Sequence, residues 1–285
     1  MRNTLLALVL ALPAIAQPPV QQPAFQVKIT GHGPPMILIP GLASSGETWD
    51  STVARYQDRY ECHVLTLAGF AGVPRIPAPM LDQVRDQLAT YIRDKKLVKP
   101  VIVGHSLGGF ITLALASKYP DLPGKLVIVD ALPSLAAMFQ PDITPEQAKA
   151  QSGLTRQYMT SQPANEQATR AQIRAMVTSD ADFERIMTWG RASDYSAIVD
   201  AMVEMYGSDL RADIAAIHSP TLVLATWIGY KPYTDREKTE ANTRRVYARL
   251  KDVDIRITDT SRHFIMYDDP QWFFAQIDEF LGGKS

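Results

Sequence analysis

The chain has little of several features that would identify other classes of protein. Its 285 residues include one cysteine, so no disulfide bond can form within the chain. Cys62 lies in the apolar run Cys62–Leu65, and we interpret it as a small buried side chain rather than a reactive thiol. Charge of one sign is not in excess, because 29 basic and 30 acidic residues give a formal net charge of −1. This balance gives no reason to expect nucleic acid or an anionic membrane as a partner.

The apolar run nearest the amino terminus is too short to span a membrane. It covers Leu5–Leu12, whereas a helix needs about 20 residues to cross a bilayer. Arg2 precedes this run and Ala14-Ile15-Ala16 follows it, an order typical of a secretory signal peptide with a small-x-small cleavage site. We therefore expect residues 1–16 to be a signal peptide that is cut after Ala16. The mature protein is then expected to be secreted or periplasmic, without stable membrane insertion.

Short apolar runs alternate with helical patterns along most of the chain. The runs are Met36–Ile39, Cys62–Leu67, Val101–Val103, Leu126–Val129, Thr221–Ala225 and Asp254–Thr258. Several are nearly continuous in Val, Ile and Leu, which is typical of parallel strands that are buried on both faces. Amphipathic stretches such as Leu81–Lys95 lie between them. This alternation predicts an α/β fold with a doubly wound, mostly parallel sheet, in which Phe25–Thr30 is an edge strand.

One interval, residues 133–210, breaks the alternation. It contains only helix-compatible segments, namely Pro145–Thr160, Glu166–Thr178, Asp182–Arg191 and Tyr195–Tyr206. We expect this interval to form a helical lid over the carboxyl edge of the sheet. The predicted core is then residues 25–132 and 211–285, and the proline-rich residues 17–24 form a flexible lead-in. The methionines of the interval either fill the core of the lid or line a deformable acyl pocket; they are Met138, Met159, Met176, Met187, Met202 and Met205.

The strongest chemical signal is the sequence Gly104-His105-Ser106-Leu107-Gly108-Gly109. It follows the apolar run Val101–Val103 and precedes the helical pattern Phe110–Tyr119, so this G-x-S-x-G motif lies between a strand and a helix. A sharp turn there leaves no room for side chains at the flanking glycines. It also places the hydroxyl at the amino terminus of a helix, where unpaired N–H groups and the helix dipole stabilise developing negative charge. We therefore predict that Ser106 is a nucleophile.

A serine hydroxyl needs a base, and the chain has five histidines. His32 lies in a Gly/Pro turn, His63 in a predicted strand and His218 before Ser-Pro, so each is interpreted as a turn or packing residue. His105 lies in a turn that points it away from the hydroxyl. His263 follows the last predicted strand, and loops at the carboxyl ends of parallel strands meet at one edge of the sheet. His263 is therefore the predicted base.

Two backbone N–H groups are needed to stabilise the oxyanion of a tetrahedral intermediate. One is expected to belong to Leu107, directly after the nucleophile. The other is expected in the loop Pro40-Gly41-Leu42-Ala43, where Gly41 lets the backbone approach closely. We assign the second donor to the N–H of Leu42.

Together these motifs resemble the lidded α/β-hydrolase superfamily, close to its carboxylesterases and lipase-like members. The resemblance covers roughly residues 25–281. It rests on the Pro40-Gly41-Leu42 loop, the Gly104–Gly109 motif, the position of the lid, and His263 ahead of Asp269-Pro270. The resemblance implies the α/β-hydrolase fold, the order Ser…acid…His along the chain, and a lid after the sixth strand in the family's count.

Two short segments depart from the pattern of the family. Many relatives have His-Gly where this chain has Pro40-Gly41, and Gly-His where it has Arg262-His263. Neither difference removes a required backbone donor or the base. The Arg262 side chain is expected to form a surface ion pair, with binding of a substrate carboxylate as the alternative.

A larger departure concerns the acid of the triad. The family usually places this residue in the loop after the seventh strand, here Thr221–Ala225. The first carboxylate in that loop is Asp235, and the segment Thr234–Glu237 also matches a helix-capping box. Asp235 is therefore a candidate acid that has an equally simple interpretation as the start of a helix.

The competing candidate acid is Asp130, which directly follows the predicted strand Leu126–Val129. Some members of the superfamily, including haloalkane dehalogenases, take their acid from that position. The acid must be semi-buried and fixed, because it orients the histidine and stabilises the imidazolium. The end of a strand meets this requirement better than an exposed helix start, so we predict Asp130 and keep Asp235 as the alternative.

These residues predict acyl transfer to water on a small-molecule ester, through an acyl-enzyme on Ser106. The alternatives among enzymes are an amidase or aminopeptidase, a lactonase and a cofactor-free perhydrolase. Dehalogenase and epoxide hydrolase chemistry is disfavoured, because the related families use aspartate in place of Ser106. A non-catalytic ligand-binding protein is the alternative from another class, and the intact Ser106 and His263 argue against it. No metal or organic cofactor is expected, and the sequence does not define an oligomeric state.

Overall fold

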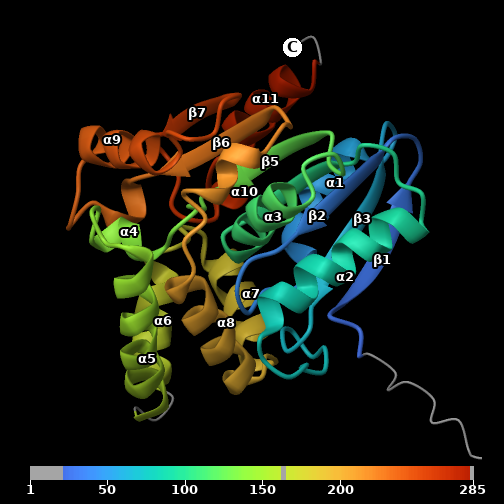
Figure 1. Ribbon diagram of the computed structural model, residues 1–285. Helices are drawn as coiled ribbons and strands as arrows, with labels where there is room; N and C mark the ends of the chain where they lie inside the picture. Colours follow the sequence, from blue (N-terminus) through green and yellow to red (C-terminus); the bar gives the residue numbers. More distant parts are fainter. Residues whose placement is uncertain (1–21, 162–164, 283–285) are drawn as a thin grey trace, which may run out of the picture.

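The computed structural model describes residues 22–161 and 165–282 (Figure 1). The predicted signal peptide, residues 1–16, lies outside these ranges, and so do residues 17–21 of the predicted lead-in. Within the described ranges, no helix combines the length and the apolar composition that crossing a membrane requires.

The described residues form one sheet of seven strands, in which β1 is antiparallel to its neighbour and the other strands are parallel. The strands are β1 (Phe25–Gly31), β2 (Pro35–Ile39), β3 (Glu61–Leu67), β4 (Val101–His105), β5 (Lys125–Val129), β6 (Thr221–Thr226) and β7 (Val253–Thr258). Their order in the sheet is β1-β3-β2-β4-β5-β6-β7. The predicted α/β fold with a doubly wound, mostly parallel sheet is therefore confirmed.

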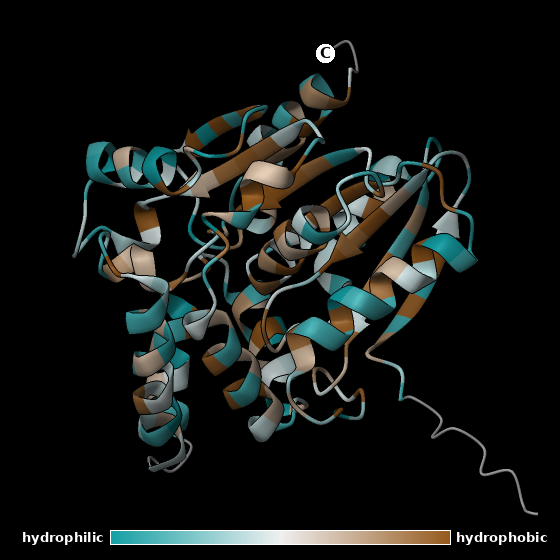
Figure 2. Ribbon diagram, in the orientation of Figure 1, coloured by the Kyte–Doolittle hydropathy of each residue, from teal (hydrophilic) through white to brown (hydrophobic). Residues whose placement is uncertain are grey.

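Alternating side chains give the sheet two hydrophobic faces. In β2, Ile37 belongs to one buried cluster and Leu38 to the other, because successive side chains of a strand point to opposite faces. Helices α2 (Met80–Asp94) and α3 (Leu107–Lys118) cover the first face, and α1 (Asp50–Tyr56) and α11 (Pro270–Leu281) cover the second. In Figure 2 the central strands are mostly brown, whereas α2 carries much teal. Helices on both faces are what a buried parallel sheet requires.

A helical insertion, residues 133–210, separates β5 from β6. Its helices are α4 (Ala136–Phe139), α5 (Pro145–Ser161), α6 (Glu166–Arg174), α7 (Asp180–Arg191) and α8 (Tyr195–Gly207). Helices α5 to α8 lie close to the predicted segments, except that α6 ends at Arg174 rather than at Thr178, and α4 was not predicted. In the described residues the insertion follows β5, the fifth strand. The expected lid after the sixth strand used the strand numbering of the family, in which this strand is the sixth.

Backbone hydrogen bonds attach the insertion to the loop that follows the carboxyl end of β3. The N–H of Asp194 donates to the carbonyl of Gly69 at 2.8 Å, and the N–H of Gly72 donates to the carbonyl of Ala192 at 2.9 Å. The insertion therefore lies at the carboxyl edge of the sheet, where Figure 1 shows α7 and α8.

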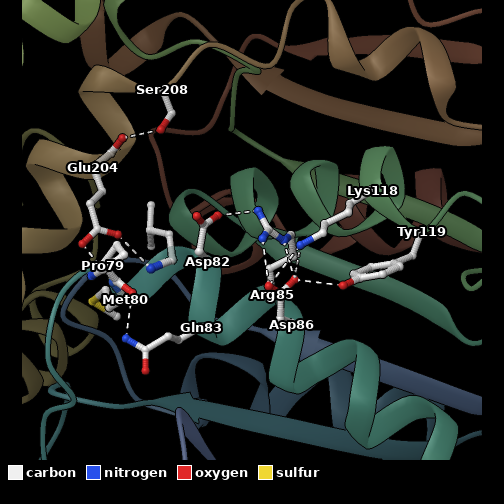
Figure 3. Close-up of polar contacts among 11 residues, drawn as sticks. Pro79, Met80, Asp82, Gln83, Arg85, Asp86, Lys118, Tyr119, Glu204 and Ser208 are labelled. Atoms are coloured by element: carbon white, nitrogen blue, oxygen red, sulfur yellow. Dashed lines mark hydrogen bonds and ion pairs between the residues drawn. The ribbon is translucent and has the colours of Figure 1, made fainter.

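A carboxylate of the insertion also caps a helix of the core. Glu204 of α8 accepts hydrogen bonds from the backbone N–H groups of Met80 at 2.9 Å and Leu81 at 2.8 Å (Figure 3). These groups open α2, where N–H groups lack partners within the helix and the dipole favours an anion. Burial raises the pKa of the Glu204 carboxyl, while the two hydrogen bonds act in the opposite direction. The insertion and the core are thus also joined at the contact between α8 and the start of α2.

The sulfur-containing side chains pack mainly as hydrophobic residues. Cys62 is buried, and burial raises the pKa of its thiol to about 11, in agreement with its interpretation as a small buried residue. Four methionines of the insertion lie in or against the two buried clusters, namely Met176, Met187, Met202 and Met205. Met138 and Met159 are half-buried, and their role in an acyl pocket stays a prediction.

Candidate active site

Ser106 occupies a strained turn between β4 and α3. Its backbone has φ 52° and ψ −117°, in a region that non-glycine residues rarely adopt and that costs about 1–3 kcal/mol. Two backbone hydrogen bonds hold this conformation: Ser106 N–H donates to the carbonyl of Val129 at 2.9 Å, and Phe110 N–H donates to the carbonyl of Ser106 at 3.0 Å. The side chain stays half-exposed at the start of α3. The turn therefore has the geometry that the G-x-S-x-G motif predicts.

The two glycines around Ser106 permit a close approach of three backbone segments. A Cβ atom on Gly104 would lie 2.3 Å from the carbonyl oxygen of Gly108. A Cβ atom on Gly108 would lie 2.2 Å from the carbonyl oxygen of Ile39, at the end of β2. The start of α3 is consequently in direct contact with the strand that leads into the Pro40-Gly41-Leu42 loop.

The loop after β2 lies against the nucleophile. A Cβ atom on Gly41 would be 3.3 Å from Cβ of Ser106, so only glycine fits there without displacing its neighbours. Ala43 has φ 53° and turns the chain away from this contact. Within the described part of the chain, neither Leu42 N–H nor Leu107 N–H donates a hydrogen bond. The loop after β2 and the start of α3 thus each provide one backbone N–H group, of Leu42 and of Leu107, that has no protein partner among the described residues.

His263 and Asp130 form a short, semi-buried contact. His263 Nδ1 lies 2.5 Å from Asp130 Oδ2, and the exposed fractions of the two side chains are 12% and 11%. The second carboxylate oxygen of Asp130 accepts a hydrogen bond from Thr226 N–H at 3.2 Å, and Asp130 N–H donates to the carbonyl of Leu224 at 2.7 Å. Asp130 directly follows β5 and has φ 44°. Its carboxylate is therefore fixed by the sheet and directed at the imidazole.

The structure does not bring Asp235 to His263. Asp235 is the exposed N-cap of α9 (Arg236–Val246), and its carboxylate accepts a hydrogen bond from Lys238 N–H at 2.8 Å. It also forms an ion pair with Lys238 Nζ at 2.9 Å. Hydrogen bonds from Lys238 lower the pKa of Asp235. In the described residues, Asp235 therefore has the partners of a helix cap, and Asp130 is the carboxylate that contacts the histidine.

Thr226, at the end of β6, contacts both the acid and the loop of His263. Thr226 is the last residue of β6, and its hydroxyl donates to the carbonyl of Ser261, in the loop that carries His263. Its backbone N–H is the donor to Asp130 already described. The end of β6 thus contributes to the site by holding the acid and the histidine loop in place.

From the sequence we expected His105 to point away from the Ser106 hydroxyl and to have no role in the site. In the structure the ring of His105 supports the loop that carries His263. His105 is fully buried, and its Nε2–H donates to the carbonyl of His263 at 3.1 Å. The ring centroids of the two histidines are 4.6 Å apart. Burial, together with the proximity of His263, holds the pKa of His105 well below its ordinary value, so the ring is neutral. Its position directly before Ser106 was the only sequence signal of this contact.

Other side chains singled out by the sequence have structural partners. His63 is buried between the Tyr91 hydroxyl at 2.7 Å and Glu61 at 2.8 Å, as expected of a packing residue. Arg262 does not form the expected surface ion pair in the described residues. Its guanidinium group donates to the carbonyls of Arg174 at 2.5 Å and Val177 at 3.0 Å, so the ion-pair prediction is wrong.

No metal-binding cluster is found in residues 22–161 and 165–282. None of the groupings of His, Cys, Asp and Glu there brings together three or more side chains that could hold an ion.

Comparison with known proteins identifies the family. Residues 36–276 match the model of the Alpha/beta hydrolase family, a span that covers most of the chain. The chain therefore belongs to the α/β-hydrolase family.

Curated relatives and a solved structure agree with this membership. The pimeloyl-[acyl-carrier protein] methyl ester esterase of Vibrio vulnificus is 30% identical over 107 residues, which are 38% of this chain and only 40% of that protein. The protein of the same name from Nitrosomonas europaea is 25% identical over 211 residues, 70% of this chain and 79% of the relative. A thermophilic esterase from Thermogutta terrifontis, with malate bound, covers 90% of this chain and 93% of its own at a TM-score of 0.73 and 21% identity. This last likeness shows the fold.

The contact between Gly108 and the end of β2 gives a first prediction. Gly108→Ala is expected to lower the free energy of unfolding by about 1–3 kcal/mol, because the new Cβ atom has to displace backbone atoms. Gly153→Ala in α5 is the matched control, since a Cβ atom there meets nothing within 4 Å. The control is expected to be neutral or stabilising by up to about 1 kcal/mol. Urea unfolding of both variants provides the measurement, and equal stabilities would contradict the close approach.

Proposed function

We propose that the chain is a serine hydrolase that cleaves carboxylic esters, with Ser106 as nucleophile, His263 as base and Asp130 as the acid of the triad. The observation that carries this proposal is the 2.5 Å contact between His263 Nδ1 and Asp130 Oδ2. It supports the proposal because a semi-buried carboxylate on Nδ1 leaves Nε2 of a neutral imidazole free to accept a proton. The names of the two curated relatives, both methyl ester esterases, favour esters within the family.

The first half of the proposed reaction forms an acyl-enzyme. Nε2 of His263 takes the proton of the Ser106 hydroxyl, and Ser106 Oγ attacks the carbonyl carbon of the ester. The carbonyl oxygen becomes an oxyanion and accepts hydrogen bonds from the N–H groups of Leu42 and Leu107. Asp130 keeps the imidazole in the required tautomer and stabilises the imidazolium. When the intermediate collapses, the alcohol leaves with the proton from His263.

The second half repeats these steps with water. His263 accepts a proton from a water molecule, and the oxygen of that water attacks the acyl carbon on Ser106. The same two N–H groups stabilise the second oxyanion. Collapse releases the carboxylic acid and returns the proton to Ser106 Oγ. We propose that the helical insertion, residues 133–210, acts as the lid that limits which acyl and alcohol groups reach this centre.

Replacing the nucleophile gives the most direct test of the chemistry. Ser106→Ala is expected to lower kcat for short-chain p-nitrophenyl esters by at least about 1000-fold, because no acyl-enzyme can form. Circular dichroism spectra of both proteins control for folding. A variant that keeps a tenth of the wild-type rate would rule out Ser106 as the nucleophile.

Two matched substitutions test the choice of acid. Asp130→Asn is expected to lower kcat by about 10³–10⁴-fold, because the amide favours the wrong tautomer of His263. Asp235→Asn is expected to change kcat by no more than about twofold, since asparagine caps a helix as well as aspartate does and the site is exposed. Steady-state hydrolysis of p-nitrophenyl butyrate by both variants is the measurement. A large loss of kcat in Asp235→Asn alone would show that Asp130 is not the acid.

We further propose that the protein is exported, on the strength of the pattern Arg2, Leu5–Leu12 and Ala14-Ile15-Ala16. Expression of the full chain in a bacterium is expected to give a periplasmic or secreted protein that begins at Gln17. Amino-terminal sequencing of the exported fraction measures this. Recovery of protein that starts at Met1, in the cytoplasm only, would refute the signal peptide.

A further inference from the structure

The segment at the end of α6 and the part of the chain that carries His263 are joined by five hydrogen bonds. We call residues 174–178 the lid segment, which begins at the last residue of α6. We call residues 261–268 the histidine loop, which includes the short helix α10 (Ile265–Asp268). The guanidinium group of Arg262 donates to the carbonyls of Arg174 and Val177. Carbonyls at the end of a helix lack partners within it, and the helix dipole favours a cation there. Arg262 therefore closes the carboxyl end of α6 from the neighbouring loop.

A second residue of the histidine loop, Asp268, binds the lid segment with its carboxylate. One oxygen accepts from the N–H of Thr178 at 2.9 Å and from its hydroxyl at 2.5 Å. The other oxygen accepts from the N–H of Arg262 at 2.8 Å. Asp268 consequently fixes the backbone of Arg262 and the lid segment with the same carboxylate.

A backbone hydrogen bond on the other side of His263 completes the connection. Phe264 N–H donates to the carbonyl of Met176 at 3.1 Å. The residues directly before and after His263 are thus both attached to the lid segment. The carbonyl of His263 itself is held from the opposite side by His105. The orientation of the imidazole depends on both attachments.

We propose that Arg262 is a positioning residue that couples the lid segment to His263, an inference that rests on the proposed function. The guanidinium group contacts protein carbonyls and holds the histidine loop in the orientation in which His263 can deprotonate Ser106.

The test compares Arg262→Met with Arg262→Lys and with a matched control. Methionine keeps most of the apolar stem but donates no hydrogen bond, whereas the lysine ammonium group can still donate to a carbonyl. Arg244→Met serves as the control, because Arg244 is exposed on α9 and pairs with Glu240 of its own helix. Thr178→Val provides a second variant, which removes one donor to Asp268 from the lid side.

The substrates are methyl hexanoate and monomethyl adipate, which differ by one free carboxylate. Rates are followed by pH-stat titration, and melting temperatures are recorded for each protein. Arg262→Met is expected to lower kcat about 10- to 100-fold on both substrates with little change in KM, since a misplaced base slows the chemistry and not the binding. Arg262→Lys is expected to recover most of kcat, Thr178→Val to show a smaller loss, and Arg244→Met to match the wild type.

Three results would overturn the inference. A rise in KM confined to monomethyl adipate would mean that Arg262 binds the substrate carboxylate. Lower melting temperatures with unchanged kcat in Arg262→Met and Thr178→Val would mean that these residues only stabilise the fold. If the wild type hydrolyses esters and Arg262→Met hydrolyses them equally well, only the coupling is refuted. If the wild type has no esterase activity, the proposed function is refuted as well.

Discussion

The contact between His263 and Asp130 depends on how two neighbouring strands end. Strands β4 and β5 pair in parallel, with His105 opposite Val129, so Ser106 and Asp130 are the next residues at the same edge of the sheet. Both have positive φ angles, and each donates its backbone N–H to the last part of the adjacent strand. Two strained residues side by side cost about 1–3 kcal/mol each, and the buried sheet supplies the stability that holds them. The sheet therefore fixes the nucleophile and the acid as one unit.

His263 has no such support from a strand, because it lies in a loop after β7. Its position results from contacts with three other parts of the chain: His105 beside the nucleophile, Thr226 at the end of β6, and the segment after α6. The first two belong to the core and the third to the helical insertion. The loop of His263 is therefore held by the core and by the helical insertion together.

Much of the fold could be predicted from the sequence, because buried parallel strands leave continuous apolar runs and the glycines around Ser106 mark a turn with no space for side chains. The choice between the two candidate acids, Asp130 and Asp235, was less firmly determined by the sequence than the fold was. The end of a strand favoured Asp130 over Asp235, and the packing of β5 beside β6 shows which carboxylate contacts His263. The contacts of His105 and Arg262 were missed or misjudged because both are long-range contacts to backbone carbonyls, which carry no residue-specific pattern.

The most direct test of a serine activated by a histidine and a buried aspartate is covalent labelling with a fluorophosphonate, followed by intact-protein mass measurement and peptide mapping. The account predicts a single adduct on Ser106 of the wild-type protein and a strongly reduced labelling rate in Asp130→Asn. Absence of an adduct, an adduct on another residue, or equal labelling rates in the two proteins would contradict it.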